Sequence, residues 1–113
     1  PLQALVLMND PQFFEASRIF AEKIIKNRVS LKDQITYCFR LSTGRFPKDE
    51  EINVLVELFE NQYQYFLQNR NKAYQILSVG EKPRDQNIFS VKAAAMTMVA
   101  NTLINHNETF TRR

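Results

Sequence analysis

Residues 48–69, KDEEINVLVELFENQYQYFLQN, carry the clearest helical pattern in the chain. Apolar side chains recur every three or four positions, so they form one stripe along a helix. The first turn contains three acidic residues, which favour the positive end of the helix dipole. The segment predicts the longest helix of the fold, and its expected core stripe is Ile52, Leu55, Val56, Phe59, Tyr63, Phe66 and Leu67.

The preceding helix is bounded by local signals at both ends. Ser30 is a favourable N-cap with an acidic residue three positions later, close to a capping box. Gly44 can adopt the left-handed conformation that ends a helix, and Phe46-Pro47 prevents its continuation. We expect this helix to begin at Leu31 and to bury Leu31, Ile35, Cys38, Phe39 and Ser42.

Another helix is predicted before it. Asp10 is a candidate N-cap, with Pro11 in the first helical position, where the missing N–H of proline does no harm. The helix continues to about Arg28. Its expected buried face contains Phe13, Ala16, Phe20 and Ile24, and the charged residues are expected on the opposite face.

The remainder of the chain also has helical patterns. A short helix is expected over residues 2–8, and another over 72–79 that ends at Gly80. After a loop at 81–87, the last helix is expected over about 88–105. Ala93-Ala94-Ala95 is small enough there to permit close helix packing.

Length and composition agree with this pattern. A chain of 113 residues supports one domain over residues 1–113, and 44% hydrophobic with 24% charged residues is typical of globular proteins. Two glycines and four prolines favour long helices over a turn-rich β fold. We therefore predict an all-α fold, a single helical bundle of five or six helices, in which the second, fourth and last helices are the main walls.

Charge limits the classes of partner. The net charge is +3, and a basic first half precedes an acidic patch at Asp49, Glu50, Glu51, Glu57 and Glu60. Opposite charges on neighbouring helices favour internal or interdomain pairing. The basic residues of the second helix are diluted by Glu15 and Glu22, so nucleic-acid binding is not expected. No stretch approaches the length of a transmembrane helix, so none is predicted in this chain.

The single cysteine, Cys38, excludes an intrachain disulfide and a zinc site with several thiolates. The sequence around it lacks the second cysteine and the histidine of a c-type haem attachment motif, so covalent haem is excluded in this chain. Cys38 falls on an apolar stripe, which favours core packing over a nucleophilic role. His106 could be a distal haem ligand for a neighbouring domain, but a capping or surface role is favoured.

Two groups of residues are candidates for contacts. Asn101, Asn105, Glu108 and Arg112 are spaced by four, three and four residues and form one polar stripe on the last helix. This stripe could bind a sugar or face an upstream segment, and a solvated face is the alternative interpretation. Asn9-Asp10 is the most prominent acidic pair, and helix capping accounts for Asp10.

The uncharged start of the chain is the second candidate. Leu2, Leu5, Val6 and Met8 cannot all point inward from one short helix, so we expect a docking surface there. The chain is therefore expected to be the carboxy-terminal fragment of a larger multi-domain protein. Its expected partners are the upstream domains of that protein, with self-association through this surface when they are absent.

Several segments together resemble one family. They are residues 1–13, PLQALVLMNDPQF; residues 39–47, FRLSTGRFP, with Glu50-Glu51; residues 79–85, VGEKPRD; and residues 99–112, VANTLINHNETFTR. This order resembles the carboxy-terminal part of the planctomycete surface domain one family, domain of unknown function 1553, over essentially the whole chain. Relatives often have Thr or Ser where this chain has Lys48, so the start of that helix is expected to be weaker.

The resemblance implies an exported bacterial protein, periplasmic or at the cell surface, often with a c-type cytochrome module upstream. No cofactor is expected in this chain itself, whereas haem would belong to an upstream domain. No family activity can be transferred to individual residues. The expected function is a non-catalytic structural or interaction module at the carboxy-terminal end of an exported envelope protein. The alternative is part of a hydrolase or carbohydrate-active enzyme whose active site is completed by upstream domains, so enzymatic activity stays open.

Overall fold

The computed structural model describes residues 11–111 of the chain, with side chains described for residues 14–105. All regular elements in this part are helices, which confirms the all-α prediction. They are α2 (Pro11–Asn27), α3 (Leu31–Thr43), α4 (Asp49–Gln68), α5 (Arg70–Leu77) and α6 (Ser90–Thr111). The helix expected over residues 2–8 and the Asp10 cap lie outside the described residues.

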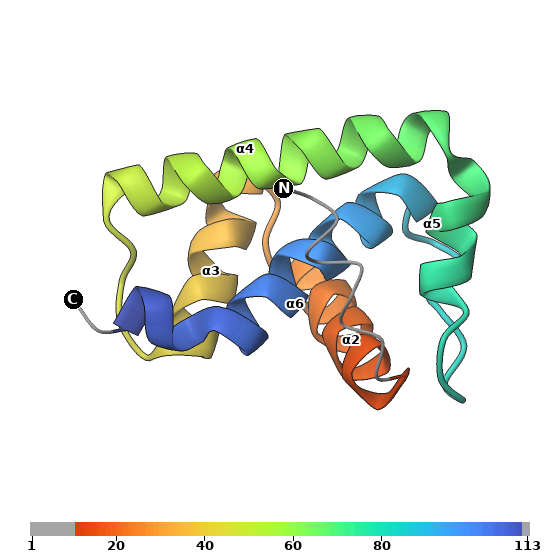
Figure 1. Cartoon of the computed structure of the whole chain (residues 1–113), viewed down its shortest axis with the longest axis horizontal. Helices are drawn as coiled ribbons and strands as arrows, with labels where there is room; N and C mark the ends of the chain where they lie inside the picture. The colour runs from red at the N-terminus through yellow and green to blue at the C-terminus, as the bar shows by residue number, and fades with distance from the viewer. Residues whose placement is uncertain (1–10, 112–113) are drawn as a thin grey trace.

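Helix α6 is the centre of the fold and packs against each of the other four helices. Its side chains from Ser90 to Leu103 are buried almost without interruption, because a helix that is apolar on all sides must be covered on all sides. Helix α4 lies along one long side of the molecule, and α5 folds back from its end (Figure 1). The pairs α2–α6 and α4–α6 are the most extensive, as expected for the main walls.

The predicted caps of α3 are confirmed. The hydroxyl of Ser30 accepts a hydrogen bond of 3.1 Å from the backbone N–H of Asp33. Gly44 ends the helix in the left-handed region with a φ of 82°. Helix α4 begins differently, because the side chain of Lys48 provides no cap. Instead, the carboxylate of Glu51 accepts a hydrogen bond of 2.8 Å from the backbone N–H of Lys48.

Other boundaries and faces differ from the prediction. Helix α5 begins two residues before the expected Lys72 and ends at Leu77, while α6 begins at Ser90 and continues to Thr111. In α3, Leu31 and Ser42 are only half-buried. In α4, Leu67 is 38% exposed, whereas the polar Gln62 is buried.

The buried face of α2 was predicted only in part: Ile24 is buried as expected, and the side chain of Phe13 lies outside the described ones. Ala16 is exposed and Phe20 is half-buried, whereas two charged residues, Arg18 and Glu22, are buried. The charged residues of α2 therefore do not all lie opposite the core. The reason is a contact with a distant loop, which supplies the partners that buried charges require.

Candidate interaction surface

A row of charged side chains on α2 holds the loop that follows α5. Glu15, Arg18, Glu22 and Lys26 are spaced by three or four residues, so they lie along one face of the helix. All four contact residues 81–85 through side-chain or backbone groups. We call this arrangement the α2–loop clasp.

The backbone of the loop supplies most of the clasp. The carboxylate of Glu15 accepts hydrogen bonds from the backbone N–H groups of Glu81 at 2.9 Å and Lys82 at 2.7 Å. The guanidinium of Arg18 donates to the carbonyl of Lys82. These bonds satisfy loop groups that have no partner in a helix, and they give the buried Arg18 a structural role.

The second half of the clasp is ionic. One oxygen of Glu22 lies 3.3 Å from the guanidinium of Arg18 and accepts a hydrogen bond of 3.0 Å from the backbone N–H of Asp85. The ammonium of Lys26 lies 2.6 Å from the carboxylate of Asp85. This ammonium, helped by the backbone N–H of Asn87, holds the pKa of Asp85 below its usual value, while the pKa of Lys26 is raised by the same pair.

Gly80 precedes the clasp and is required for two reasons. Its φ of 93° lies in the region that only glycine adopts without strain. A Cβ atom at this position would also overlap the side chain of Glu15. The close approach of Gly80 to Glu15 is what brings the two following N–H groups onto the carboxylate.

A second cluster lies where α5, the loop and the start of α6 meet. The Cζ atom of Arg70 lies 5.1 Å from the ring centre of Phe89 and 5.9 Å from that of Tyr74. The Cζ atom of Arg84 lies 5.6 Å from the ring centre of Tyr74. These are cation–π distances. We call Arg70, Tyr74, Arg84 and Phe89 the arginine–aromatic cluster.

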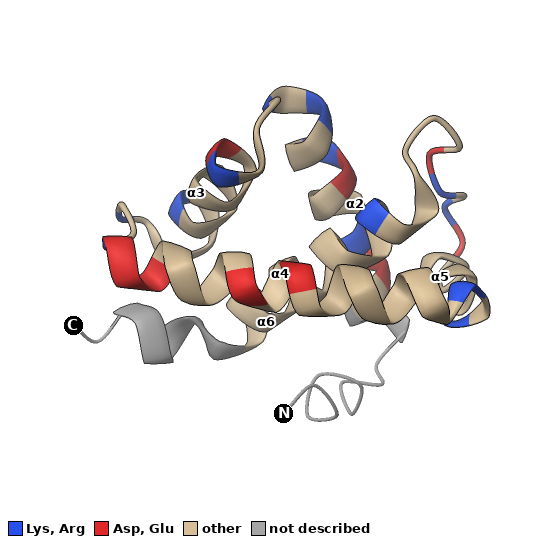
Figure 2. Ribbon diagram, turned by 90° about the horizontal axis from the view of Figure 1, so that it is seen from above, with Lys and Arg blue, Asp and Glu red and all other residues tan. Residues whose placement is uncertain are grey.

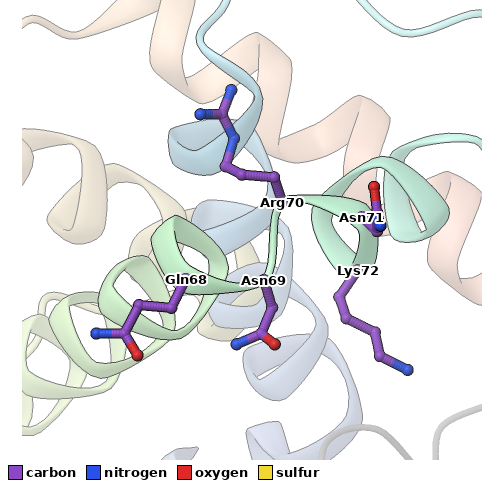
Figure 3. A pocket seen from close by; sticks show the side chains of 5 residues that line it. All are labelled: Gln68, Asn69, Arg70, Asn71 and Lys72. Carbon is purple, nitrogen blue, oxygen red and sulfur yellow. The ribbon is translucent and has the colours of Figure 1, made fainter.

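The cluster is positively charged, and its rings and Arg70 are exposed, whereas Arg84 is half-buried and one of its guanidinium nitrogens is buried. Tyr74 is 41% exposed and Phe89 is 47% exposed. Hydrogen bonds to Tyr74, first from Ser90 and then from Arg70, lower its pKa, and the positive charges of Arg70 and Arg84 act in the same direction. Figure 3 shows that the side chain of Arg70 leaves the α4–α5 turn on the side opposite to those of Gln68 and Asn69. Exposed aromatic rings beside guanidinium groups are common in protein interfaces.

The predicted polar stripe is divided by the structure. Asn101 is fully buried, and its Nδ2 donates a hydrogen bond of 3.2 Å to the hydroxyl of Ser17 on α2. Asn105 is half-buried, and its Nδ2 donates to the backbone carbonyl of Asn101 at 2.8 Å. Asn101 thus joins two helices. The side chains of Glu108 and Arg112 lie outside the described part, and binding by the stripe stays a prediction.

The other predicted positions have different outcomes. Cys38 is fully buried, as expected for core packing, and burial raises the pKa of its thiol to about 12. The predicted docking surface of Leu2, Leu5, Val6 and Met8 lies outside the described residues, as does the side chain of His106. Among the side chains that are described, no group of histidine, cysteine and acidic residues is arranged to hold a metal ion. No helix in the described part is long and apolar enough to span a membrane.

Hollows also lie on the surface formed by the described side chains. One of about 490 Å³ lies between the second half of α2 and the clasped loop, and Lys23, Lys26, Lys82, Glu22 and Asp85 line it. Two more, each of about 450 Å³, lie at the α4–α5 turn and beside Leu31, Phe59 and Tyr63. Opposite charges line the first hollow, and its central Lys26 and Asp85 already pair with each other. Unlike these hollows, the arginine–aromatic cluster brings two cations and two exposed rings to one place.

Fold and surface together define a small all-α domain with an exposed cationic and aromatic cluster. The chain belongs to the PSD1 family, proteins of unknown function (DUF1553), whose family model matches residues 1–59. The match contains α2, α3 and the first half of α4, so it is shorter than the expected resemblance over the whole chain. No curated protein and no solved structure matches the chain.

Sequence inspection did not identify either the clasp or the cluster. The clasp joins residues more than sixty positions apart, such as Glu15 and Lys82. Its signal was the row of alternating charges on α2, which an exposed helical face also produces. The signal for the cluster was Arg70 and Tyr74, one helical turn apart, but nothing indicated that Arg84 and Phe89 would meet them.

Proposed function

We propose that this chain is a non-catalytic interaction module at the carboxy-terminal end of an exported, cytochrome c-linked bacterial envelope protein. Its partners are the upstream domains of the same protein. The single observation that supports an interaction role is the arginine–aromatic cluster, in which Tyr74 and Phe89 expose large parts of their rings beside two guanidinium groups. Tyrosine and arginine are enriched among the residues that contribute most to protein binding.

The described structure supports an architectural use for the buried charges. The carboxylates of Glu15 and Glu22 and the guanidinium of Arg18 all contact backbone groups of one loop. Acidic groups held in this way by backbone N–H groups act as structural acceptors. This favours an interaction module over a site in which the same carboxylates transfer protons.

The test uses the chain and the upstream region of its parent protein as two separate polypeptides. Isothermal titration calorimetry should detect binding, and Phe89→Ser should weaken it while far-ultraviolet circular dichroism stays unchanged. The parent should be recovered from the periplasmic or envelope fraction and should stain for covalent haem. Hydrolysis of glycans by the isolated chain, or no binding to the upstream region, would refute the proposal.

A further inference from the structure

Neither arginine of the cluster forms an ion pair in the part of the chain that the structure describes, and Asp85, whose pKa the charge of Arg84 helps to lower, is paired with Lys26. The ion pairs found there engage Arg18, Lys26 and Arg45. Arg70 and Arg84 instead face the same ring, that of Tyr74, at 5.9 and 5.6 Å. Both positive charges therefore lie close to Tyr74, and an anionic group that approaches this ring would be attracted by both of them.

The surroundings of the two arginines are apolar and exposed. Phe89 lies beside Arg70 at the start of α6, and Tyr63 packs against it with 6.4 Å between ring centres. A ligand for this surface therefore needs an anionic group and apolar atoms close to it.

We propose that the arginine–aromatic cluster is the docking site for an acidic segment of a partner polypeptide. A carboxylate of that segment is attracted to Arg70 and Arg84, and a neighbouring apolar side chain rests on Tyr74 and Phe89. Guanidinium groups suit this task because their planar donors match a carboxylate and they also stack on aromatic faces. The inference rests on the proposed interaction role and specifies the chemistry of the partner.

Charge on the neighbouring helix favours a short acidic segment over a nucleic acid. Asp49, Glu50, Glu57 and Glu60 of α4 are exposed. Figure 2 shows how the acidic residues are distributed along that helix. A long polyanion that followed the surface beyond the cluster would meet these carboxylates. Nucleic-acid sites instead provide a continuous basic groove along the phosphate backbone.

The binding experiment uses a short synthetic peptide in which glutamate and leucine alternate, with one tryptophan. Since the chain itself has no tryptophan, the peptide alone reports binding through its fluorescence anisotropy. The same peptide with glutamine in place of glutamate should bind about tenfold more weakly, the loss expected for one charge-assisted contact. Arg70→Gln with Arg84→Gln should produce a similar loss for the acidic peptide.

Lys72→Gln with Lys32→Gln is the matched control, because it removes the same charge from two exposed positions outside the cluster. It should change the affinity less than about twofold, the effect of distant and screened charges. Arg70→Lys with Arg84→Lys retains the charge and tests the need for the planar guanidinium. It should still weaken binding, and circular dichroism should show that all variants are folded.

If Arg70→Gln with Arg84→Gln and the control Lys72→Gln with Lys32→Gln weaken binding equally, the proposal is overturned, because affinity would then follow net charge alone. Tighter binding of an oligothymidylate than of the acidic peptide would assign the cluster to nucleic acid. Failure of the acidic peptide to bind would also overturn it. If the upstream region still binds in that case, the proposed interaction role stands and only the chemistry of the partner is wrong.

Discussion

Replacing Gly80 by alanine should destabilise the fold more than the same replacement at Gly44. Both glycines have a positive φ, 93° and 82°, so alanine at either position must adopt a left-handed conformation in which its Cβ atom is crowded by the backbone. This strain is about 1–2 kcal/mol. A Cβ atom at Gly44 meets no atom within 4 Å, whereas at Gly80 it overlaps the side chain of Glu15. Gly44→Ala therefore measures the backbone effect alone.

The additional loss at Gly80 comes from displacing Glu15. Its carboxylate holds the backbone N–H groups of Glu81 and Lys82, and moving it breaks both hydrogen bonds. We expect about 1–2 kcal/mol for the pair, at the low end for charged hydrogen bonds because Glu15 is partly exposed. Gly80→Ala should then cost about 2–4 kcal/mol in total.

Urea denaturation followed by far-ultraviolet circular dichroism measures these differences in the free energy of unfolding. A double-mutant cycle with Glu15→Ala separates the two effects. Once the Glu15 side chain is absent, Gly80→Ala should cost only as much as Gly44→Ala. If Gly80→Ala destabilises the protein equally in the presence and absence of the Glu15 side chain, the overlap with Glu15 contributes nothing. Equal destabilisation by Gly80→Ala and Gly44→Ala in the wild-type background would lead to the same conclusion.

Three further predictions concern buried or paired groups. Arg18→Met should lower the free energy of unfolding by about 3–5 kcal/mol, because Glu22 is then buried without its cation. Adding Glu22→Gln should restore part of this stability, whereas a decrease below about 1 kcal/mol for Arg18→Met in urea denaturation would contradict the prediction. The pKa of Asp85 is lower in the folded protein than in the unfolded chain, where it is about 3.9, so ionised Asp85 stabilises the fold above that pH and this stabilisation is lost as the pH falls. The free energies of unfolding of wild type and Asp85→Asn should therefore converge in strong acid and differ near neutral pH. Cys38 should react with iodoacetamide only at the rate of global unfolding, since its thiol is buried with a pKa of about 12, and fast labelling of the native protein would refute that.

The sequence predicted those parts of the fold that depend on local signals. Ser30 and Gly44 bound α3 as expected, because a cap acts within one turn of the helix. The all-α class and the role of the last helix as one of the main walls also follow from local periodicity and composition. The ends of α5 and α6 were predicted less accurately. Gly80 follows a turn after α5 and does not end the helix itself, and the polar residues beyond Asn105 continue α6 to Thr111.

The faces of α2 could not be predicted in the same way. Arg18 and Glu22 are typical of an exposed surface, and burial becomes favourable only when distant groups pair with them. Those groups are the carbonyl of Lys82 and the N–H of Asp85, which belong to a loop without a sequence pattern of its own. Tertiary contact thus decided that Arg18 and Glu22 are buried, whereas helical periodicity correctly indicated Ile24 and wrongly indicated Ala16.

The clasp also determines where the arginine–aromatic cluster can form. Arg84 lies between Lys82, whose carbonyl is held by Arg18, and Asp85, whose N–H and carboxylate are held by Glu22 and Lys26. Because Lys82 and Asp85 on either side of Arg84 are both held by α2, the guanidinium of Arg84 stays near the ring of Tyr74 on α5. A loop fixed in advance loses less entropy when a ligand binds. The charged row of α2 and the cations of the cluster are therefore parts of one arrangement, in which one helix holds the loop and the loop positions Arg84.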